Sequence, residues 1–483
     1  MLSKQFPDPE PTPGFNNNDN DSDGLPPEAR RWAILSIAIG VGMASLDTAI
    51  ANTALPAMAD QLHASPAASV WIINAYQLAM VATLLPFAAL GETLGYRRVC
   101  IGGLVLFTVA SLACAMAWSL PSLVVARLFQ GVGASAIMGV NTAMLRAIYP
   151  RHLQGRGFGT NALVVAVAFA IGPTAASLIL AIAPWPWLFA INVPLGVIAF
   201  FLGRRVLPVI KRASHRVDAL SAIYNVGAFS LLILALGDAA HRAPLAMLLP
   251  EMLGAALCFA LLLQRQSGHA APMLPVDLLR RPMFALAVVT SMCTFTAQGL
   301  AFVALPFYFE DTLGRSAIET GFLMTPWAVL VGVMAPIAGR LSDHYSPGVL
   351  GGIGLAALSL GLLTLMLMPA APSVWDISWR MALCGIGFGF FQAPNLKAFM
   401  ASAPAERGGS ASGMVATSRL IGQASGAALV AFCFTLSSVR GASYALGIAA
   451  SFAAVASVAS LMRMVIVLPK KAASAPSEAP KQM

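Results

Sequence analysis

The sequence predicts an all-helical integral membrane protein that crosses the bilayer many times. Hydrophobic residues make up 58% of the 483 residues and charged residues only 10%, whereas a soluble domain carries about 25% charged residues. The apolar residues come in blocks of about 20 or more, the length that a helix needs to cross the roughly 30 Å hydrocarbon core. Helices are expected because the alternating pattern of membrane β-strands is absent and no other open segment satisfies its backbone in lipid.

Fourteen apolar blocks follow one another along the chain, and each predicts one transmembrane helix. They span residues 33–55, 69–90, 99–118, 121–147, 158–183, 187–206, 218–237, 244–264, 284–308, 318–341, 348–369, 378–402, 410–436 and 442–464. The acidic and Asn-rich composition before them predicts a disordered cytoplasmic tail over 1–32, and a second cytoplasmic tail is expected over 465–483. No basic segment leads directly into an apolar run near the start of the chain, so no signal peptide is expected.

The basic residues predict the orientation of the chain. With both termini placed in the cytoplasm, 23 of the 29 Lys and Arg residues fall on cytoplasmic segments and four on outer ones. Because Lys and Arg accumulate in cytoplasmic loops, this asymmetry favours a multi-pass protein of the plasma membrane, as in a bacterial inner membrane, with both termini inside. Topology and attraction to anionic headgroups explain the net charge of +9, so no nucleic-acid partner is expected.

No pattern of catalytic or metal-ligating residues is visible in the sequence. The six cysteines show no CxxC spacing, and the six histidines lie in tail-side or loop segments. There is no P-loop for ATP hydrolysis. A membrane receptor or a membrane-embedded enzyme would need a nucleophile beside a base, a metal cluster or a sizeable extramembrane domain. We therefore expect no enzyme, no metal site and no cofactor.

Two opposite charges stand inside apolar blocks at similar depth. Asp47 lies roughly 12 Å and Arg127 roughly 9 Å from the outer edges of their blocks, at 1.5 Å per helical residue. A carboxylate at that depth costs about 2.5 to 3.5 kcal/mol unless it is paired, hydrated or protonated. The two residues therefore predict either a structural ion pair or a proton site at which Arg127 approaches and withdraws. Arg419, in the thirteenth block, is interpreted as a snorkelling or packing residue.

Glycines predict close helix packing in four of the blocks, since small residues let transmembrane helices approach one another. They are Gly131, Gly133, Gly172, Gly385, Gly387, Gly389, Gly422 and Gly426. Pro173 follows Gly172 in the middle of the fifth block. A proline in this position removes a backbone hydrogen bond, so it predicts a bend in the helix.

Several segments resemble motifs of the major facilitator superfamily. Residues 88–98 read AALGETLGYRR, which is similar to the family's GxLaDRxGRr gate motif. Gly91, Gly95 and Arg97 fit the motif, Glu92 stands in place of Asp, and other positions depart from it. The corresponding loop of the second half reads GRLSD, from Gly339 to Asp343, a recurrence expected of a fold built from internal repeats.

Further segments resemble the superfamily's fourteen-helix drug:proton antiporter branch. Residues 127–131 read RLFQG, similar to the fourth-helix arginine motif that is implicated in proton transfer. Residues 168–173 read AFAIGP, close to the antiporter signature GxxxGPxxGG, with Gly172 and Pro173 in place. Residues 185–196 read WPWLFAINVPLG, similar to WRWxFxINVPxG, and residues 46–56 resemble the first-helix motif of this branch.

This resemblance covers about residues 30–465 and implies an architecture. It implies two six-helix bundles over 33–206 and 266–464, with a basic loop and two inserted helices over 207–265. It also implies a substrate site near mid-membrane between the bundles and proton coupling through Asp47 and Arg127. The candidate substrate-binding residues are Asn52, Tyr76, Gln77, Gln130, Asn141, Gln298, Phe302, Gln392 and Asn395.

The function implied is proton-coupled export of hydrophobic or cationic compounds, that is, multidrug efflux by alternating access. The expected partners are a small-molecule substrate, protons and the lipid bilayer, and no accessory periplasmic protein is indicated. The alternative keeps the fold and changes the task to proton-coupled transport of one metabolite, such as a sugar, amino acid or siderophore.

Overall fold

The computed structural model describes residues 24–150, 153–210, 218–240, 243–266, 276–342, 344–369, 371–403, 408–437 and 439–464, and every element in them is helical. In chain order the elements are α1 (Pro27–Thr53), α2 (Leu55–Gln61), α3 (Pro66–Ser69), α4 (Trp71–Leu90), η1 (Gly91–Gly95), α5 (Tyr96–Ala115), α6 (Leu120–Ile148), α7 (Gln154–Ile182), α8 (Pro186–Ala190), α9 (Asn192–Val206), α10 (Ala219–Ala240), α11 (Leu245–Gln266), η3 (Val276–Arg280), α12 (Pro282–Phe307), η4 (Tyr308–Thr312), α13 (Ala317–Leu341), α14 (Pro347–Met366), α15 (Val374–Ser402), α16 (Gly408–Leu436) and α17 (Gly441–Met462).

Within these residues, twelve helical segments are long and apolar enough to cross a membrane. One of the twelve, Pro66–Ala115, contains both α4 and α5, which the π-helical turn η1 joins. α15 is not among the twelve, and it carries Gln392, Asn395 and Lys397 between its apolar residues. The chain is therefore a multi-pass membrane protein, and most of the predicted apolar blocks lie on one long helix each.

Two helix boundaries differ from the sequence prediction for local reasons. α1 begins at Pro27, so the predicted tail over 1–32 ends earlier, and residues 1–23 lie outside the described part. Proline at the first helical position and Glu28 in the first turn both favour a helix start there. The predicted helix over 187–206 is divided into α8 and α9, because Pro194 has no N–H to donate to the carbonyl of Ala190.

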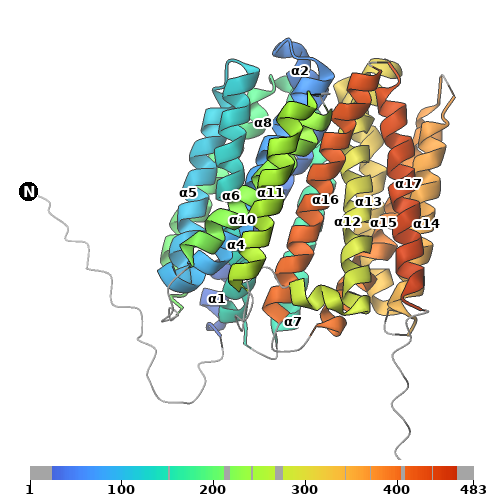
Figure 1. The fold of residues 1–483 in the computed structure, drawn as a ribbon. Coiled ribbons are helices and arrows are strands. Elements are labelled where there is room, and N and C mark those ends of the chain that lie inside the picture. The colour runs from blue at the N-terminus through green and yellow to red at the C-terminus, as the bar shows by residue number, and fades with distance from the viewer. Residues whose placement is uncertain are drawn as a thin grey trace, which may run out of the picture.

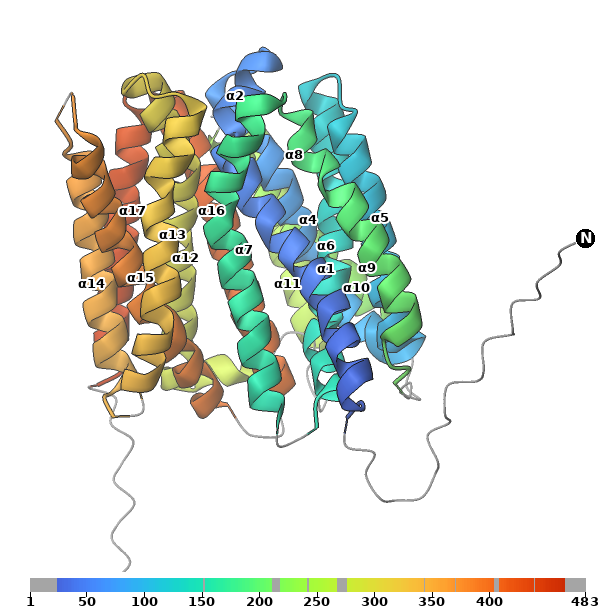
Figure 2. The same cartoon turned by 180° about the vertical axis from the view of Figure 1, so that it is seen from behind.

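The helices form two groups that meet along two contacts. α1 and α4 to α9 pack with one another, α12 to α17 do the same, and the groups meet where α7 packs against α13 and α4 against α16. α10 and α11 pair with each other, and α10 packs against both α4 and α16 (Figure 1). α1 begins and α17 ends at the same end of the assembly (Figure 2).

The two groups use the same glycine contacts, which shows an internal repeat at the level of single residues. A Cβ added to Gly131 of α6 would overlap the Tyr76 carbonyl oxygen of α4, and one added to Gly385 of α15 would overlap the Trp327 carbonyl oxygen of α13. Similar overlaps recur where α6 packs on α5 and where α15 packs on α14. Only glycine permits such an approach of two helix backbones.

Candidate functional site

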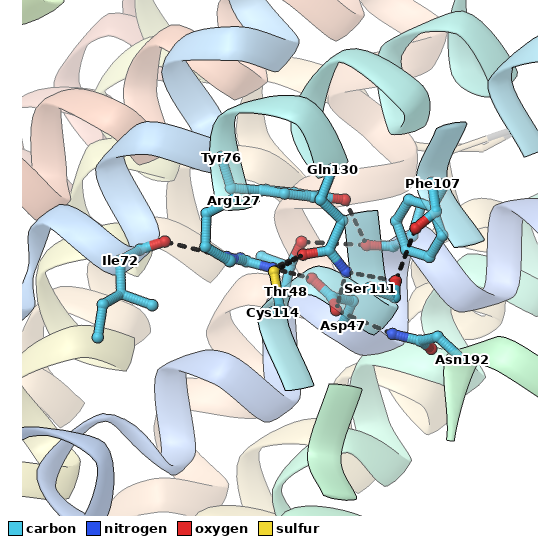
Figure 3. Close-up of polar contacts among 11 residues, drawn as sticks. Asp47, Thr48, Ile72, Tyr76, Phe107, Ser111, Cys114, Arg127, Gln130 and Asn192 are labelled. Carbon is cyan, nitrogen blue, oxygen red and sulfur yellow. Dashed lines mark hydrogen bonds and ion pairs between the residues drawn. The ribbon is translucent and has the colours of Figure 1, made fainter. Parts of the chain in front are cut away.

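A buried ion pair lies at the centre of the first helix group. Asp47 of α1 and Arg127 of α6 are each 1% exposed, and an Arg127 Nη1 hydrogen bond reaches Asp47 Oδ2 (Figure 3). The other carboxylate oxygen, Oδ1, accepts hydrogen bonds from Gln130 Nε2 at 2.7 Å and from Asn192 Nδ2 at 3.0 Å. Three donors on three side chains therefore stabilise Asp47 as a carboxylate, which offsets the cost of burying its charge.

Arg127 is held from several sides as well. Its Nε donates to the Ile72 carbonyl of α4 at 3.0 Å, and its Nη1 donates to Gln130 Oε1 at 2.6 Å. The guanidinium carbon lies 4.2 Å from the Tyr76 ring centroid and 5.4 Å from that of Phe189, distances at which an aromatic ring attracts a cation. The network thus joins α1, α4, α6, α8 and α9.

Sequence reasoning predicted the contact between Asp47 and Arg127 and missed other members of the network. Asn192 is the first residue of α9 and reaches Asp47 across 145 positions of sequence. Ser111 of α5 accepts from Gln130 Nε2 at 2.9 Å, and the Cys114 thiol donates to Gln130 Oε1 at 3.4 Å. Asn192 carried a signal, because it is a polar residue inside an apolar block.

A cavity lies between the two helix groups, and the space between its lining atoms is about 780 Å³, including the part that is open to the surroundings. Its walls come from α1, α4, α6 and α7 on one side and from α12, α13, α15 and α16 on the other. A ligand in this cavity would therefore contact both helix groups at once.

Five of the nine candidate substrate-binding residues line this cavity, namely Tyr76, Gln77, Gln298, Phe302 and Gln392. The other four lie elsewhere. Gln130 belongs to the Asp47 network, Asn141 donates to Asn161 Oδ1 at 3.0 Å, and Asn395 accepts from Arg463 at 2.7 Å. Asn52 is buried in α1, and its Oδ1 has no hydrogen-bond partner among the described residues.

The cavity wall also holds residues that the sequence did not single out as lining. They include Phe169, Phe295, Trp327, Phe388, Arg419 and Gln423. The aromatic members are in contact with one another, since the Phe302 ring centroid lies 5.4 Å from that of Phe169 and 5.1 Å from that of Trp327. The wall is therefore mainly aromatic and aliphatic, with a few amide side chains.

Tyr76 connects the ion pair with the cavity. Its ring lies against the Arg127 guanidinium, its hydroxyl donates to the Ala44 carbonyl of α1 at 3.1 Å, and both Tyr76 and Ala44 line the cavity. A ligand in the cavity would therefore contact a side chain that itself contacts the charged pair.

Side chains of α7 and α13 meet beyond one end of the cavity. Thr174 Oγ1 lies 2.7 Å from Thr325 Oγ1, and the Ser177 hydroxyl donates to the Ala317 carbonyl at 2.9 Å. On α7 these residues follow the cavity-lining positions 165–170, and on α13 they precede 327–331. The two helix groups are thus joined at this end, which is the predicted outer side.

The predicted gate residues of the first half form a turn with special geometry. Gly91, Glu92 and Gly95 lie in η1, and Gly95 has φ +102°, which glycine adopts without strain. Arg97, just beyond, donates to the Arg204 carbonyl near the end of α9. Gly339 lies near the end of α13, whereas Asp343 lies outside the described residues.

The segment that resembles the antiporter signature lies where α7 crosses α1. A Cβ on Gly172 would overlap the Ala49 Cβ, so glycine is needed for this approach. α7 continues through Pro173 as far as Ile182, and the Pro173 carbonyl accepts a hydrogen bond from the Ser177 hydroxyl at 3.0 Å. The predicted role of Gly172 as a packing residue agrees with this contact.

The helical assembly and the cavity between its two groups define a multi-pass membrane protein of the transporter type. The sequence profile of the Major Facilitator Superfamily matches residues 37–427, and the chain belongs to this superfamily.

Several similar proteins are named as transporters or resistance proteins. The chain is 50% identical over 444 residues to the uncharacterized transporter YebQ of Escherichia coli K12, covering 92% of this chain and 97% of YebQ. It is 29% identical over 412 residues to the riboflavin transporter RibZ of Clostridioides difficile, covering 84% and 89%. It is also 29% identical over 406 residues to the multidrug resistance protein Stp of Mycobacterium tuberculosis, covering 82% and 74%.

The fold is also that of solved transporters. A POT family transporter in complex with a thioalcohol-conjugated peptide superposes with a TM-score of 0.69 at 15% identity, over 90% of this chain and 96% of that one. At this identity the likeness concerns the fold alone.

Proposed function

We propose that this chain is a proton-coupled exporter of hydrophobic compounds that works by alternating access. The observation that carries the proposal is the buried Asp47–Arg127 pair, which touches the cavity through Tyr76. The cavity is the proposed substrate site, and Asp47 is the proposed proton site.

The coupling follows from the hydrogen bonds of Asp47. A proton on this carboxylate would remove the negative charge that Arg127, Gln130 and Asn192 share. Arg127 would then lie buried without a counter-ion, so protonation favours a rearrangement of α1 against α6 and α9. Each proton that enters releases about 2.3 kcal/mol per 100 mV of membrane potential, in addition to the pH difference.

The wall of the cavity supports hydrophobic substrates. It is largely aromatic and aliphatic, and no carboxylate is present among its described residues. We therefore do not extend the proposal to cationic compounds, which the family resemblance implied as the alternative to hydrophobic ones. The similarity to Stp, which is named a multidrug resistance protein, supports drug export by this chain.

The alternative function is proton-coupled transport of one metabolite. The similar protein RibZ is named a riboflavin transporter. In the cavity of this chain, the amides of Gln77, Gln298 and Gln392 supply polar groups that could select one compound. A narrow competition profile in binding assays would favour this alternative over broad export.

We also propose the architecture of fourteen transmembrane helices. The two six-helix bundles would comprise residues 33–206 and 266–464, with α10 and α11 inserted between them over 207–265. The chain would lie in a bacterial inner membrane, with both termini on the cytoplasmic side. The twelve spans become fourteen when α4 and α5, which share one span, are counted separately and α15 is added. This count supports the proposed number.

The proposed function is tested with the purified full-length chain in proteoliposomes under an imposed proton gradient. Three aromatic dyes serve as substrates: neutral Nile red, anionic fluorescein and cationic rhodamine 123. We expect the gradient to drive transport of at least one dye, a protonophore to abolish it, and Asp47→Asn at matched reconstitution to lose it. If the gradient moves none of the dyes, broad export is wrong, and if Asp47→Asn transports like the wild type, Asp47 is not the proton site.

A further inference from the structure

One cation in the cavity has no counter-ion among the described residues. Arg419 of α16 is the single charged side chain among the described residues that line the cavity. Its Nε is buried without a hydrogen-bond partner, and no described carboxylate pairs with it. The other buried arginine near the cavity, Arg127, has Asp47 as its counter-ion. A guanidinium without an anion is costly at this depth unless water or a ligand compensates its charge.

A second donor, on another helix of the same group, is also unsatisfied. Trp327 of α13 lines the same cavity, is 1% exposed, and has an indole N–H without a hydrogen-bond partner among the described residues. A buried donor left without an acceptor costs about 1 to 3 kcal/mol. Two residues of one cavity, on α13 and α16, thus carry unsatisfied donors, and acceptor oxygens are the ligand groups that such donors bind.

The rest of the wall fits a flat apolar body. Phe169 and Phe302 form an aromatic pair with ring centroids 5.4 Å apart, and Phe295 and Phe388 form another with centroids 5.6 Å apart. Aromatic side chains favour contact with the faces and edges of other rings. The wall therefore combines ring contacts with one positive charge.

We propose that the substrates are aromatic anions, planar ring systems that carry a carboxylate or a similar anionic oxygen group bound by Arg419. The guanidinium fork matches two oxygens of such a group, while a cationic compound would meet an unscreened positive charge. This inference rests on the proposed function, since it takes the cavity as the substrate site. Export of an anion from a cell interior at negative potential is also favoured by that potential.

The test measures equilibrium binding without any gradient, so that it does not depend on transport. The full-length chain in phosphatidylcholine nanodiscs is titrated with fluorescein and with rhodamine 123, which share one tricyclic skeleton and differ in charge. Binding is followed by fluorescence anisotropy, with empty nanodiscs subtracted. We expect the wild type to bind fluorescein about tenfold more tightly than rhodamine 123, or better, as one charge-assisted contact provides.

Substitutions then assign the preference to one residue. Arg419→Gln is expected to lose about tenfold or more in fluorescein affinity, Arg419→Lys to fall between it and the wild type, and Arg419→Glu to bind rhodamine 123 more tightly than the wild type does. Such a gain cannot arise from misfolding. The control is Arg380→Gln, which removes an arginine that pairs with Asp376 at the far end of α15 and should leave the dye preference unchanged.

The inference is overturned if the wild type binds the two dyes equally, prefers rhodamine 123 or binds neither. It is also overturned if Arg419→Gln and Arg419→Glu keep the wild-type preference. Loss of gradient-driven transport together with an intact preference for fluorescein would instead overturn the proposed function and leave this inference standing.

Discussion

Asp47 shows how one buried charge can organise several helices. Its two oxygens accept from Arg127, Gln130 and Asn192, which lie on α6 and α9. A buried ion pair is weak evidence for stability, because desolvation offsets much of the attraction, but removing one partner leaves the other charge without compensation. The proposed proton site uses this property, since a change in the charge of Asp47 alters the energy of the buried Arg127.

At this scale we predict that Arg127→Gln destabilises the protein by about 3 to 5 kcal/mol, because the Asp47 carboxylate remains buried without its counter-ion. The double variant Asp47→Asn/Arg127→Gln should recover a large part of that loss. Thermal and denaturant unfolding of the purified variants in detergent measure both changes. A double variant no more stable than Arg127→Gln alone would contradict the pair as the source of the loss.

At the scale of helices, glycines determine how closely the elements approach. Gly131 and Gly385 occupy equivalent places in the two halves, each against a carbonyl of a cavity-lining residue, Tyr76 or Trp327. A side chain at either glycine would push the neighbouring helix outward. The position of the cavity wall in each half therefore depends on these glycine contacts, which lie on the side of the helix backbone away from the cavity.

We predict that Gly385→Ala reduces both thermal stability and dye binding, because the added Cβ would overlap the Trp327 carbonyl and displace α13. The matched control is Gly332→Ala on α13, where an added Cβ meets nothing within 4 Å. Overpacking of this kind costs about 1 to 3 kcal/mol. Equal melting temperatures for the two variants would show that this contact does not position α13.

The helices α10 and α11 carry a separate prediction about topology. If both cross the membrane as proposed, the short link between them faces outward, and Ala243→Cys should react with a membrane-impermeant maleimide in intact cells. Arg205→Cys, near the end of α9, should react only after the cells are permeabilised. The wild-type protein is the control, and its labelling gives the contribution of the native cysteines. Labelling of Ala243→Cys only in permeabilised cells would exclude the proposed membrane topology of α10 and α11.

At the scale of the whole molecule, the two helix groups are joined on the predicted outer side of the cavity. The contacts between Thr174 and Thr325 and between Ser177 and Ala317 hold α7 against α13 there. Alternating access by rocking of two bundles requires such contacts to open in each cycle.

We therefore predict that the double variant Thr174→Cys/Thr325→Cys stops transport when oxidised and regains it when reduced. The two hydroxyl oxygens lie 2.7 Å apart, so thiols in their place are within reach of a disulfide bond of about 2.05 Å. Transport of the dyes in proteoliposomes, with each single variant under the same oxidant as control, measures the effect. Wild-type transport by the cross-linked protein would mean that this contact does not open in the cycle.

The sequence alone determined the helices of this protein, and it predicts their orientation. Lipid leaves no other way to satisfy the backbone, so long apolar blocks become helices whatever their neighbours are. The contact between Asp47 and Arg127 could also be predicted, because two opposite charges at one depth each need compensation. The packing role of Gly131, Gly172 and Gly385 followed from the size of glycine.

Only the tertiary structure decided which side chains face the cavity. Asn52 and Asn141 looked as suitable as Gln77, and Arg419 looked like a packing residue, yet Gln77 and Arg419 line the cavity while the two asparagines do not. A helix that is apolar on every side has no hydrophobic stripe to set its rotation. Its rotation is set by contacts with other helices, many of them far away in the chain. The sequence of one segment alone does not predict these contacts.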